Sequence, residues 1–574
     1  MIWYLEHYLR SRRERAALEA LAASVDWLTP IGWRIDGSLR LIWDADISTP
    51  ARVFPISLRF PNHFPHSPPL VLPRNEQERW SSHQFGAGGE LCLEYGPDNW
   101  HPDITGADMI ESAHRLLEAE GGGSNDGQGV PSRHKTTLGQ DLRGQFERFL
   151  VTRALSELAA TVVAGVILPA VLVVQFREEA FIHVLASADL PDGTTWTDQM
   201  FPKALGFEGY ERPAALFRWS EDRPSPSAES LVDLRAELAS AGLQLPDVKK
   251  LVLVQSTLFK AYSLHGDDTV TELAVIPEQP ANERLDEGHK ALHDRKVSVI
   301  GCGSIGSKIA TMLARSGVGK FLLVDDDVLL PDNFVRHDLD WREAGTHKAD
   351  SLARRIQLVN PIAVCEKRKH RFGGQEASGG VETLIESLGE SDLIVDCTAD
   401  ASVFNYLCAA VAVAKTPLLW AEVFGGGFGG MIARSRPQLD PDPATMRRIV
   451  ESWCQEQGKP LPTPAIDYGG TNDSPLIADD ADVTVIASHA ARMAIDTLIP
   501  REPSMYPQSV YLIGLAKGWI FDSVFETYPI DVGPPIVAPA QGEVDPEEAK
   551  AELLRIAELL AEHKDEDSSS TSDS

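Results

Sequence analysis

The sequence predicts a multidomain protein that joins α+β and α/β units. The chain has 574 residues, which corresponds to about four domains at a typical length of ~150 residues each. Short alternating strands follow a helix near the N-terminus, whereas apolar strands alternate with helices from residue 296 onward, a pattern typical of a parallel sheet. We therefore expect an α+β domain over residues 1–125, a middle α/β linker domain over 136–280, a parallel α/β domain over 286–540, and an acidic, partly disordered tail over 541–574.

Charge and hydropathy restrict the classes of partner. The chain has 53 Lys and Arg residues against 84 Asp and Glu, a net charge of −31, whereas nucleic acids and anionic membranes are bound by basic surfaces. We therefore expect neither as the main partner, and a basic protein surface suits the charge better. The most apolar run, residues 158–174, contains Pro169 and is shorter than the ~20 residues of a spanning helix, so we expect a buried strand or helix there.

Six cysteines are scattered along the chain without a CxxC spacing. This pattern argues against structural zinc and against a redox dithiol. Isolated thiols in a long chain are typical of a reducing compartment, and the N-terminus lacks the order of a secretory signal. We therefore expect a cytoplasmic protein.

The N-terminal segment predicts a helix followed by an antiparallel meander. Residues 2–23 have helical periodicity, and residues 33–43 alternate around Asp36-Gly37, a strong hairpin signal. The proline-rich stretch 61–73 cannot form a central strand. The other expected elements are a strand over 53–60, a helix over 107–120 and a flexible, glycine-rich linker over 121–129.

A glycine-rich loop predicts a nucleotide site in the third unit. The strand 296–300 runs directly into Gly301-Cys-Gly303-Ser-Ile-Gly306, after which a helix begins. The glycines let the backbone approach a phosphate, and the first N–H groups of the helix are free to bind it. The pattern fits NAD, FAD, S-adenosylmethionine and ATP alike, and a glycine turn that only packs a helix on a strand is the structural alternative.

The residues after the second strand of this unit favour a polyphosphate ligand. Asp325 lies about twenty residues past the glycines, where an acid suits a ribose hydroxyl. Arg336 and Lys348 carry charges for a polyphosphate that Asn333 would orient, whereas a nicotinamide cofactor has no γ-phosphate for them. A solvated polar loop is the alternative.

An acidic strand end predicts a metal site in the same unit. The strand 393–396 ends in Asp396, and Asp400 follows four residues later. Carboxylates at the C-terminal ends of parallel strands are well placed to hold Mg²⁺ on a triphosphate.

Together, these features make residues 286–540 resemble the Rossmann-like adenylation fold of ubiquitin-activating enzymes, the group that includes the ThiF and MoeB proteins. That family shows GxGxxG, then D-x-D-x-V-x-x-x-N-x-x-R-Q, a lysine, and D-x-T-D-N. The resemblance implies ATP and Mg²⁺ as cofactors and a homodimer. It implies ribose binding by Asp325 with Asp327 as the second acid of D-x-D, phosphate binding by Gly301, Gly303, Gly306, Asn333, Arg336 and Lys348, and metal binding by Asp400 or, second, Asp396. Two positions depart, since His337 replaces the glutamine and the second acid of DCTAD is shifted by one.

Cys92 lies in a glycine-rich loop, where a thiol stays accessible; a buried cysteine between two leucines is the alternative. Phe64-Pro-His-Ser-Pro68-Pro69 before it and Trp100-His-Pro102 after it resemble the ubiquitin-conjugating fold, over residues 1 to about 120. The resemblance implies that Cys92 is the catalytic thiol. His83-Gln84-Phe85 stands in place of H-P-N, so the asparagine that supports the oxyanion is missing, and our hypothesis is that Asn99 or His101 substitutes for it.

Cys454 is the expected acceptor thiol of the third unit. In thioester-forming members of the activating family, the acceptor cysteine follows the adenylation strands in an insertion, and Cys454 precedes a polar loop rich in Pro and Asp. The other thiols of this unit fall in the glycine loop, in strands or in an apolar helix. Arg447 and Arg448 would lower the pKa of Cys454 if they are close, and a structural cysteine is the alternative.

A conjugating domain followed by an activating domain resembles the bacterial fusion enzymes of antiphage CBASS operons. The resemblance implies that a protein C-terminal carboxylate is activated as an acyl adenylate, passed to Cys454 and then Cys92 as a thioester, and joined to a target lysine. In that group the cargo is a cGAS-like nucleotidyltransferase, and another carrier protein is the alternative cargo. A nicotinamide-dependent oxidoreductase and a non-catalytic nucleotide-binding scaffold are the alternative functions. The middle domain has no assigned role.

Overall fold

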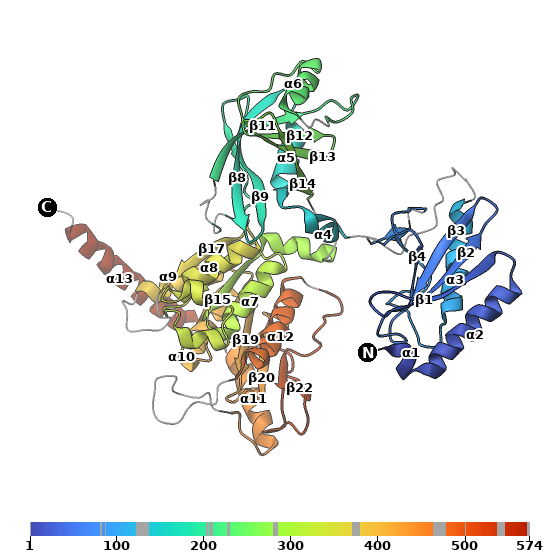
Figure 1. Ribbon diagram of the computed structural model, residues 1–574. Coiled ribbons are helices and arrows are strands. Elements are labelled where there is room, and N and C mark those ends of the chain that lie inside the picture. Colours follow the sequence, from blue (N-terminus) through green and yellow to red (C-terminus); the bar gives the residue numbers. More distant parts are fainter. Residues whose placement is uncertain are drawn as a thin grey trace. The chain divides into compact units, whose positions relative to one another are not determined.

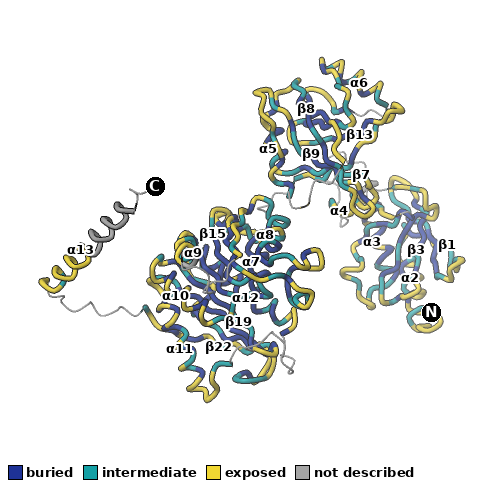
Figure 2. The backbone as a smooth tube through the Cα atoms, turned by 90° about the vertical axis from the view of Figure 1, so that its left-hand side faces the viewer, coloured by how far each residue is buried: buried dark blue, intermediate teal, exposed yellow. Residues whose placement is uncertain are grey.

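The computed structural model describes residues 2–80, 83–86, 88–121, 137–202, 205, 210–226, 230–278, 285–369, 379–462, 478–499, 501–535 and 546–570. The chain divides into two compact units, Met1–Gln145 and Phe146–Ser574, and the second contains two separate large sheets (Figure 1). The central strands of each large sheet are mostly buried, as the dark blue tube in Figure 2 shows. The predicted domain boundaries at 125, 136 and 280, and the predicted linker from residue 122 onward, lie outside the described residues.

The N-terminal unit is a four-stranded antiparallel meander flanked by helices. Its strands pair in the order β1-β2-β3-β4, and a separate two-stranded sheet, β5–β6, follows. The expected helices, hairpin and strand are confirmed, and the strand that follows the prolines lies at the edge of the sheet, where missing N–H donors are tolerated. The elements are α1 (Trp3–Glu6), α2 (Tyr8–Ser24), β1 (Leu28–Ile35), β2 (Leu41–Ser48), β3 (Val53–Arg59), β4 (Leu70–Pro73), β5 (Gln84–Phe85), β6 (Glu90–Leu91) and α3 (Gly106–Gly121).

A buried carboxylate ties α2 to the start of α3. Glu14 is fully buried, accepts a hydrogen bond from the Gly106 N–H at 2.6 Å, and pairs with Arg10 at 2.8 Å. Burial raises the pKa of Glu14. Arg10 also donates to the carbonyls of Pro102 and Ile104. The segment between Trp100 and α3 is therefore anchored on the first long helix.

The middle sheet of the chain closes on itself. Strands β8, β9, β7, β14, β13, β12 and β11 pair in this order, β11 pairs back onto β8, and the short β10 adds to β9. The expected α/β linker domain is thus built mainly of strands, because most apolar runs of the segment form strands of this sheet. The elements are α4 (Leu138–Asp141), β7 (Glu147–Leu150), α5 (Arg153–Thr161), β8 (Ile167–Arg177), β9 (Ala180–Asp189), β10 (Thr195–Thr197), β11 (Tyr210–Arg218), α6 (Leu231–Ser240), β12 (Lys250–Gln255), β13 (Leu258–Leu264) and β14 (Val270–Ile276).

The apolar run at residues 158–174 is divided between the end of α5 and most of β8. Pro169 lies in β8 opposite Ala215 of β11. Within the described part of the chain, no helix combines the length and the apolar character needed to cross a bilayer.

The C-terminal sheet is doubly wound. Its strand order is β17-β16-β15-β18-β19-β20-β21-β22, with the first five strands parallel and the last three antiparallel. The main elements are β15 (Lys296–Ile300), α7 (Ser304–Arg315), β16 (Lys320–Val324), α8 (Lys348–Val359), β17 (Val364–Arg368), α9 (Gly379–Gly389), β18 (Leu393–Asp396), α10 (Ala401–Ala414), β19 (Leu418–Val423), β20 (Gly429–Ser435), α11 (Pro443–Glu456), α12 (Asp480–Leu498), β21 (Val510–Gly514) and β22 (Thr527–Ile530).

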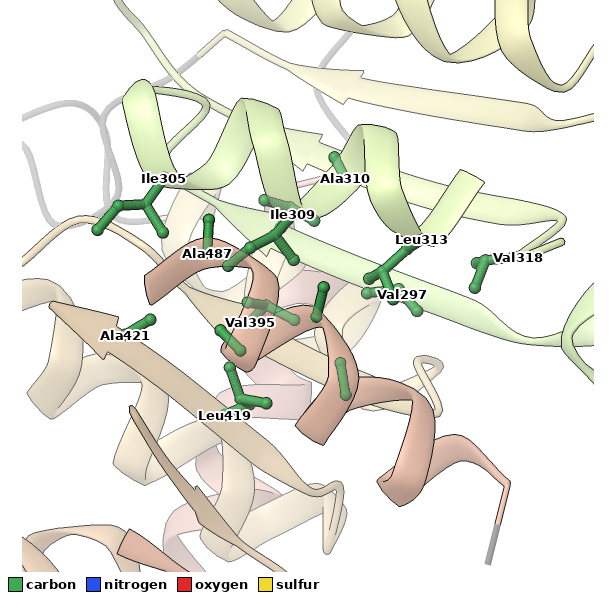
Figure 3. Packing of buried hydrophobic residues seen from close by; sticks show 14 of the residues in the cluster. Val297, Ile305, Ile309, Ala310, Leu313, Val318, Val395, Leu419, Ala421 and Ala487 are labelled. Atoms are coloured by element: carbon green, nitrogen blue, oxygen red, sulfur yellow. The ribbon is translucent and has the colours of Figure 1, made fainter. Parts of the chain in front are cut away.

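Helices cover both faces of this sheet. On one face, Ile305 and Ile309 of α7 pack with Ala487 of α12 against strand residues that include Val395 and Leu419 (Figure 3). On the other face, a second core is formed with α10 and α11. The chain order changes direction between β15 and its neighbours β16 and β18, so the C-terminal end of β15 is the switch point at which such sheets bind ligands.

A long helix, α13 (Pro546–Ser570), lies beyond the C-terminal sheet in the chain. It covers most of the segment 541–574, for which the sequence predicts a partly disordered tail, and it extends into the serine-rich end. Its described side chains, from Glu547 to Glu558, are exposed or nearly so (Figure 2).

Candidate nucleotide site and thiols

The glycine loop lies at the switch point of the C-terminal sheet, directly after β15. Gly301 has a φ of +84°, a conformation that favours glycine. A Cβ atom at Gly306 would lie 1.9 Å from the Gly301 carbonyl oxygen. At Gly303, the residue before α7, a Cβ atom would meet nothing within 4 Å. The first and last glycines therefore form the turn, and the middle glycine faces the open space in front of the helix.

We expect Gly306→Ala to destabilise the C-terminal domain by about 3 kcal/mol, because backbone atoms block the added methyl group. Gly303→Ala is the matched control, since its methyl group meets open space, and it should unfold within about 1 kcal/mol of the natural chain. Denaturant unfolding of both variants measures the difference. Equal stability of the two variants would contradict this account of the loop.

Asp325 is fixed by the glycine loop. One carboxylate oxygen accepts from the Cys302 N–H at 2.6 Å, and the other accepts from the Asp327 N–H at 2.9 Å. Burial raises the pKa of Asp325, although these two hydrogen bonds oppose the rise. Each carboxylate oxygen has a second lone pair, so the group can still accept a hydrogen bond from a hydroxyl of a ligand.

Lys348 begins α8 and forms an ion pair with Asp327. The Lys348 Nζ atom lies 2.5 Å from Asp327 Oδ2, and the Lys348 side chain is buried. Burial would raise the pKa of Asp327, but the hydrogen bond and charge of Lys348 lower it. Lys348 is also among the charges that act on Asp325 and Cys302. Lys348 therefore lies beside the glycine loop, where it can meet a phosphate.

Asn333 and Arg336 lie on the short 3-10 helix η4 (Pro331–Val335) and just after it. The Asn333 Oδ1 atom accepts from the Leu330 N–H at 3.0 Å, so half of this amide is used to cap its own turn. Arg336 donates its backbone N–H to the Asn333 carbonyl at 3.1 Å and precedes His337, which contacts the glycine loop. The phosphate-binding roles of Asn333 and Arg336 stay predictions.

His337 supports the glycine loop from behind. Its Nε2 atom lies 2.8 Å from the Cys302 carbonyl oxygen, and its Nδ1 atom accepts from the Leu339 N–H at 3.2 Å. This pattern fits a neutral ring that donates through Nε2. Burial lowers the pKa of His337 to about 4, so the ring stays neutral near pH 7. A glutamine side chain also combines a donor group, its NH2, with an acceptor, its carbonyl oxygen. Histidine can therefore stand here in place of the family's glutamine.

His337 is expected to make stability depend on pH. The pKa of about 4 in the folded state lies below the usual ~6.5, so the unfolded chain binds the extra proton first, and stability falls as pH falls from ~6.5 toward 4. We expect a loss of about 2 kcal/mol between pH 7 and pH 5 from this residue. His337→Gln should remove that loss, whereas His293→Gln, at an exposed histidine, should retain it. Denaturant unfolding at both pH values is the measurement, and an unchanged loss in His337→Gln would contradict the assignment.

Asp396 and Asp400 lie at the end of β18 and at the start of α10. Asp396 Oδ1 accepts from the N–H and the hydroxyl of Thr398, and Asp400 Oδ1 caps α10 by accepting from Ser402 N–H at 2.7 Å. Burial, aided by the charge of Asp400, raises the pKa of Asp396 to about 6. Within the described residues, each Oδ2 atom has no hydrogen-bond partner. The pair thus fits a divalent cation, although no group of three or more His, Cys, Asp or Glu side chains is arranged as a metal site in the described ranges.

Two residues that the sequence reasoning did not assign to this site line the same small cavity. Arg447 of α11 and Glu422 of β19 lie around it with Asp396 and Asp400. Burial raises the pKa of Glu422 to about 7, against the charge of Arg447. Glu422 could have been predicted, because an acid near the end of a parallel strand is a recognisable pattern. No sequence pattern predicts that Arg447 of α11 lies at the same cavity as Asp396.

Cys454 does not lie in an accessible loop, so the structure gives no support to its role as an acceptor thiol, which stays a prediction. It is on α11, has 0% exposure, and packs with Met446 and Val450 in the core. Burial, and secondarily the charge of Glu451, raises the pKa of Cys454 to about 11, so Arg447 and Arg448 do not activate it. The helix presents its inner face at intervals of four residues, which directs this sulfur into the core.

The other thiols of this domain are also unsuited to nucleophilic chemistry. Burial raises the pKa values of all four, to about 12 for Cys365, to about 11 for Cys408, and well above the usual value for Cys302 and Cys397. A thiol must ionise to attack an acyl group. Cys92 is thus the remaining candidate among the six cysteines of the chain.

Cys92 directly follows β6 and is half-buried. Its N–H donates to the His83 carbonyl at 2.8 Å, so the two residues continue the β5–β6 pairing, with the His83 side chain buried. A cavity of about 280 Å³ adjoins Cys92 and is lined mainly by apolar side chains. The lining includes Pro68, Pro69, Leu70, Val71, Phe85, Leu93, Tyr95 and Met109.

The residues after Cys92 shape the loop that bounds this cavity. The Asn99 side chain accepts from the Gly96 N–H at 2.8 Å and donates to the Glu94 carbonyl at 3.0 Å, so it holds the loop 94–99. The Trp100 indole donates to the Pro65 carbonyl at 2.7 Å. This hydrogen bond connects residues 64–69 with residues 100–102, the two segments that resemble the ubiquitin-conjugating fold. His101 is exposed and lies 3.2 Å from Asp103. The catalytic roles of His83, Asn99 and His101 stay predictions.

The sheet order, the glycine loop and the acid–lysine pair beside it define a nucleotide-binding α/β domain of the Rossmann type. Residues 281–440 match the model of the ThiF family, and this match spans the glycine loop and the residues around it. The "ATP-dependent ubiquitin transferase-like protein Cap2" of Pseudomonas aeruginosa is 29% identical over 256 residues, which are 42% of this chain and 44% of that protein. The chain therefore aligns with less than half the length of that relative.

Two further relatives cover different shares of the chain. The "Sulfur carrier protein ThiS adenylyltransferase" of Escherichia coli is 30% identical over 147 residues, 25% of this chain and 55% of that protein. The uncharacterized protein y4qC of Sinorhizobium fredii is 24% identical over 502 residues, 76% of this chain and 81% of that protein. Among solved structures, E. coli MccB with succinimide covers 44% of this chain and 69% of its own at 16% identity, with a TM-score of 0.35, too low to support an argument.

Proposed function

We propose that the C-terminal domain uses ATP to activate the C-terminal carboxylate of a protein as an acyl adenylate. The observation that carries the proposal is the glycine loop at the switch point, with Asp325 held against it and Lys348 beside it, in a segment that matches the ThiF family. The relatives named as an adenylyltransferase and as an ATP-dependent transferase support it. The ThiF match gives no support to the alternative of a nicotinamide-dependent oxidoreductase.

The proposed reaction begins at the α-phosphorus of ATP. A carboxylate oxygen attacks this phosphorus, the bond to the leaving oxygen breaks, and pyrophosphate departs. The loop N–H groups and Lys348 would bind the phosphates, and Asp325 would accept a ribose hydroxyl. Asp396 and Asp400 would hold Mg²⁺, which supplies positive charge against the charge of the departing pyrophosphate.

We further propose that Cys92 receives the acyl group and that the N-terminal unit is a ubiquitin-conjugating-like domain. The Cys92 thiolate attacks the acyl carbon and AMP leaves, which forms a thioester. A target lysine amine then attacks the thioester, loses a proton, and releases the thiol as the isopeptide bond forms. The half-buried thiol beside a cavity and the raised pKa values of the other five cysteines support this choice.

The partners of the proposed reaction follow from the same resemblance. The cargo would be a cGAS-like nucleotidyltransferase or another carrier protein, the acceptors would be lysines of a target protein, and the enzyme would act as a cytoplasmic homodimer in antiphage signalling. Because Cys454 lies in the core, the proposed route has one thioester, on Cys92.

A trapped intermediate tests the proposal. Cys92→Ser, expressed together with the genes that flank its own, should carry the cargo as a stable oxyester, which intact-mass spectrometry detects as one added protein mass. Lys348→Met combined with Cys92→Ser is the matched control and should carry no added mass. A Cys92→Ser protein without any added mass, while the natural chain still forms conjugates in the same cells, would overturn the role of Cys92.

A further inference from the structure

One arginine lies among the acids at the C-terminal edge of the parallel strands. Arg447 of α11 lines the same cavity as Asp396, Asp400 and Glu422. The other side chains around this cavity are apolar, so Arg447 is the only cation among the described residues that line it. The cavity measures about 30 Å³, whereas one water molecule needs ~10–15 Å³. It therefore has room for the two oxygens of one carboxylate.

The Arg447 guanidinium is held in place and still has donors to offer. Its Cζ atom lies 5.2 Å from the centre of the Phe404 ring, and its Nε atom lies 3.5 Å from Oε1 of Glu451, four residues later on the same helix. Both members of this ion pair are partly exposed, and within the described residues the guanidinium makes no hydrogen bond. The planar fork of an arginine fits the two oxygens of a carboxylate, so Arg447 is able to bind one.

The order of the strands separates this arginine from the residues proposed to bind ATP. The parallel strands β16, β15, β18 and β19 are neighbours in this order, so their C-terminal ends follow one another along one edge of the sheet. Lys348 pairs with Asp327 just after β16, and the glycine loop follows β15. Asp396 ends β18, and Glu422 lies near the end of β19. Arg447 therefore belongs to the β18–β19 part of this edge, whereas Lys348 belongs to the β16 part.

The segment that carries the two aspartates packs against the glycine loop. The Cys397 N–H donates to the Ile300 carbonyl at 2.8 Å, and a Cβ atom at Gly301 would lie 2.9 Å from Cγ2 of Thr398. A carboxylate in the cavity beside Arg447 would thus be separated by one short segment from the loop proposed to bind the phosphates.

The acids of the cavity make a cation necessary for a negatively charged substrate. Asp396, Asp400 and Glu422 carry like charges, which repel an incoming carboxylate. Burial raises the pKa of both Asp396 and Glu422, and the charge of Arg447 opposes that rise. The arginine is thus the group in this cavity that can offset the repulsion.

We propose that Arg447 binds the C-terminal carboxylate of the cargo and holds it for attack on the α-phosphorus of ATP. The inference rests on the adenylation proposed above and adds the residue that receives the second substrate. Two N–H groups of the guanidinium donate to the two carboxylate oxygens. During attack, one oxygen forms the bond to phosphorus as pyrophosphate leaves. The other becomes the carbonyl oxygen of the acyl adenylate and keeps its hydrogen bond to Arg447.

ATP–pyrophosphate exchange by the full chain, with acetylglycylglycine as a minimal peptide carboxylate, tests this role. Arg447→Met should raise the KM for the peptide about tenfold or more, because a charge-assisted pair is lost, and should leave the KM for ATP unchanged. Arg447→Lys should recover part of the loss, because lysine keeps the charge without the planar fork. Arg448→Met is the matched control and should keep both natural values. Arg448 is exposed on the same helix and donates to the Thr445 hydroxyl at 3.0 Å.

The outcomes separate this role from the adenylation itself. A natural KM for the peptide in Arg447→Met would overturn the role of Arg447 alone, and so would a rise in the KM for ATP as large as that for the peptide. A natural chain that binds ATP but shows no exchange, either with the peptide or with the carrier trapped on Cys92→Ser, would overturn the adenylation proposal. If Arg447→Met does not fold, Arg447→Gln serves as the second variant with the same expected rise.

Discussion

Lys348→Met should lower the rate of ATP–pyrophosphate exchange by at least about 100-fold. The natural side chain places its ammonium beside the glycine loop and next to Asp327, where the charge of a departing pyrophosphate would develop. Removing one such charge commonly costs ~3 kcal/mol of transition-state stabilisation. The measurement is exchange with the carrier protein that the Cys92→Ser trap identifies. Methionine keeps the apolar stem of the buried lysine and so limits the loss of packing.

Lys320→Met provides the matched control for the same assay. Lys320 begins β16 on the sheet next to the glycine strand, but it is exposed and lies at the opposite end of that strand from Asp325. Its exchange rate should equal that of the natural chain. An exchange rate within threefold of natural in Lys348→Met, with melting temperature retained, would remove Lys348 from the nucleotide site.

Cys92→Ala should abolish transfer of the cargo to lysine while leaving ATP–pyrophosphate exchange intact. In the proposed reaction, the first step needs only the C-terminal domain, whereas the thioester needs the Cys92 thiol beside its cavity. The two activities should therefore separate in this variant. Conjugates are measured by immunoblot against the cargo, and exchange is measured with labelled pyrophosphate.

Cys454→Ala is the comparison that distinguishes the two thiols. This substitution removes a buried sulfur from the core against α11, so we expect a loss of about 1 kcal/mol in unfolding free energy and natural levels of conjugate. Loss of conjugation in Cys454→Ala, without loss of fold, would restore the two-thioester route. Conjugation by Cys92→Ala would refute the role proposed for the N-terminal unit.

The nucleotide loop could be predicted because its requirements are local. A positive φ at Gly301 and the absence of space for a Cβ at Gly306 both concern residues within one turn of chain. Strand ends also set the positions of Asp325 and Asp396, since parallel strands end at one edge of the sheet. The residues that lie on a helix packed over that edge, such as Arg447, depend on tertiary contacts that no local pattern reports.

The sequence around Cys454 contains a signal that this residue is buried. Met446, Val450 and Cys454 are spaced by four residues, which is the spacing of one helix face. That face is buried in the structure. The prediction relied on the polar loop that follows Cys454, and the helical spacing was the stronger signal.

The closed sheet could not be predicted in the same way. Alternation along β8 and β9 indicates which residues share a face, but closure depends on the pairing of β8 with β11, which is distant in the chain. The same applies to the contact between Lys250 and Ser263, which requires the register of β12 against β13. The sequence of the middle segment therefore predicts a mixture of strands and helices and does not predict closure of the sheet.

Closure of this sheet limits how the middle domain can meet other chains. In an open sheet, the outermost strand offers unpaired N–H and C=O groups that an extended peptide can extend by one more strand. Among the described residues, the ring leaves only the three-residue β10 in that position, whereas the C-terminal sheet ends in β17 and β22. The C-terminal sheet therefore keeps two edge strands of the kind that an extended main chain can join, whereas the ring of the middle domain offers almost no such edge.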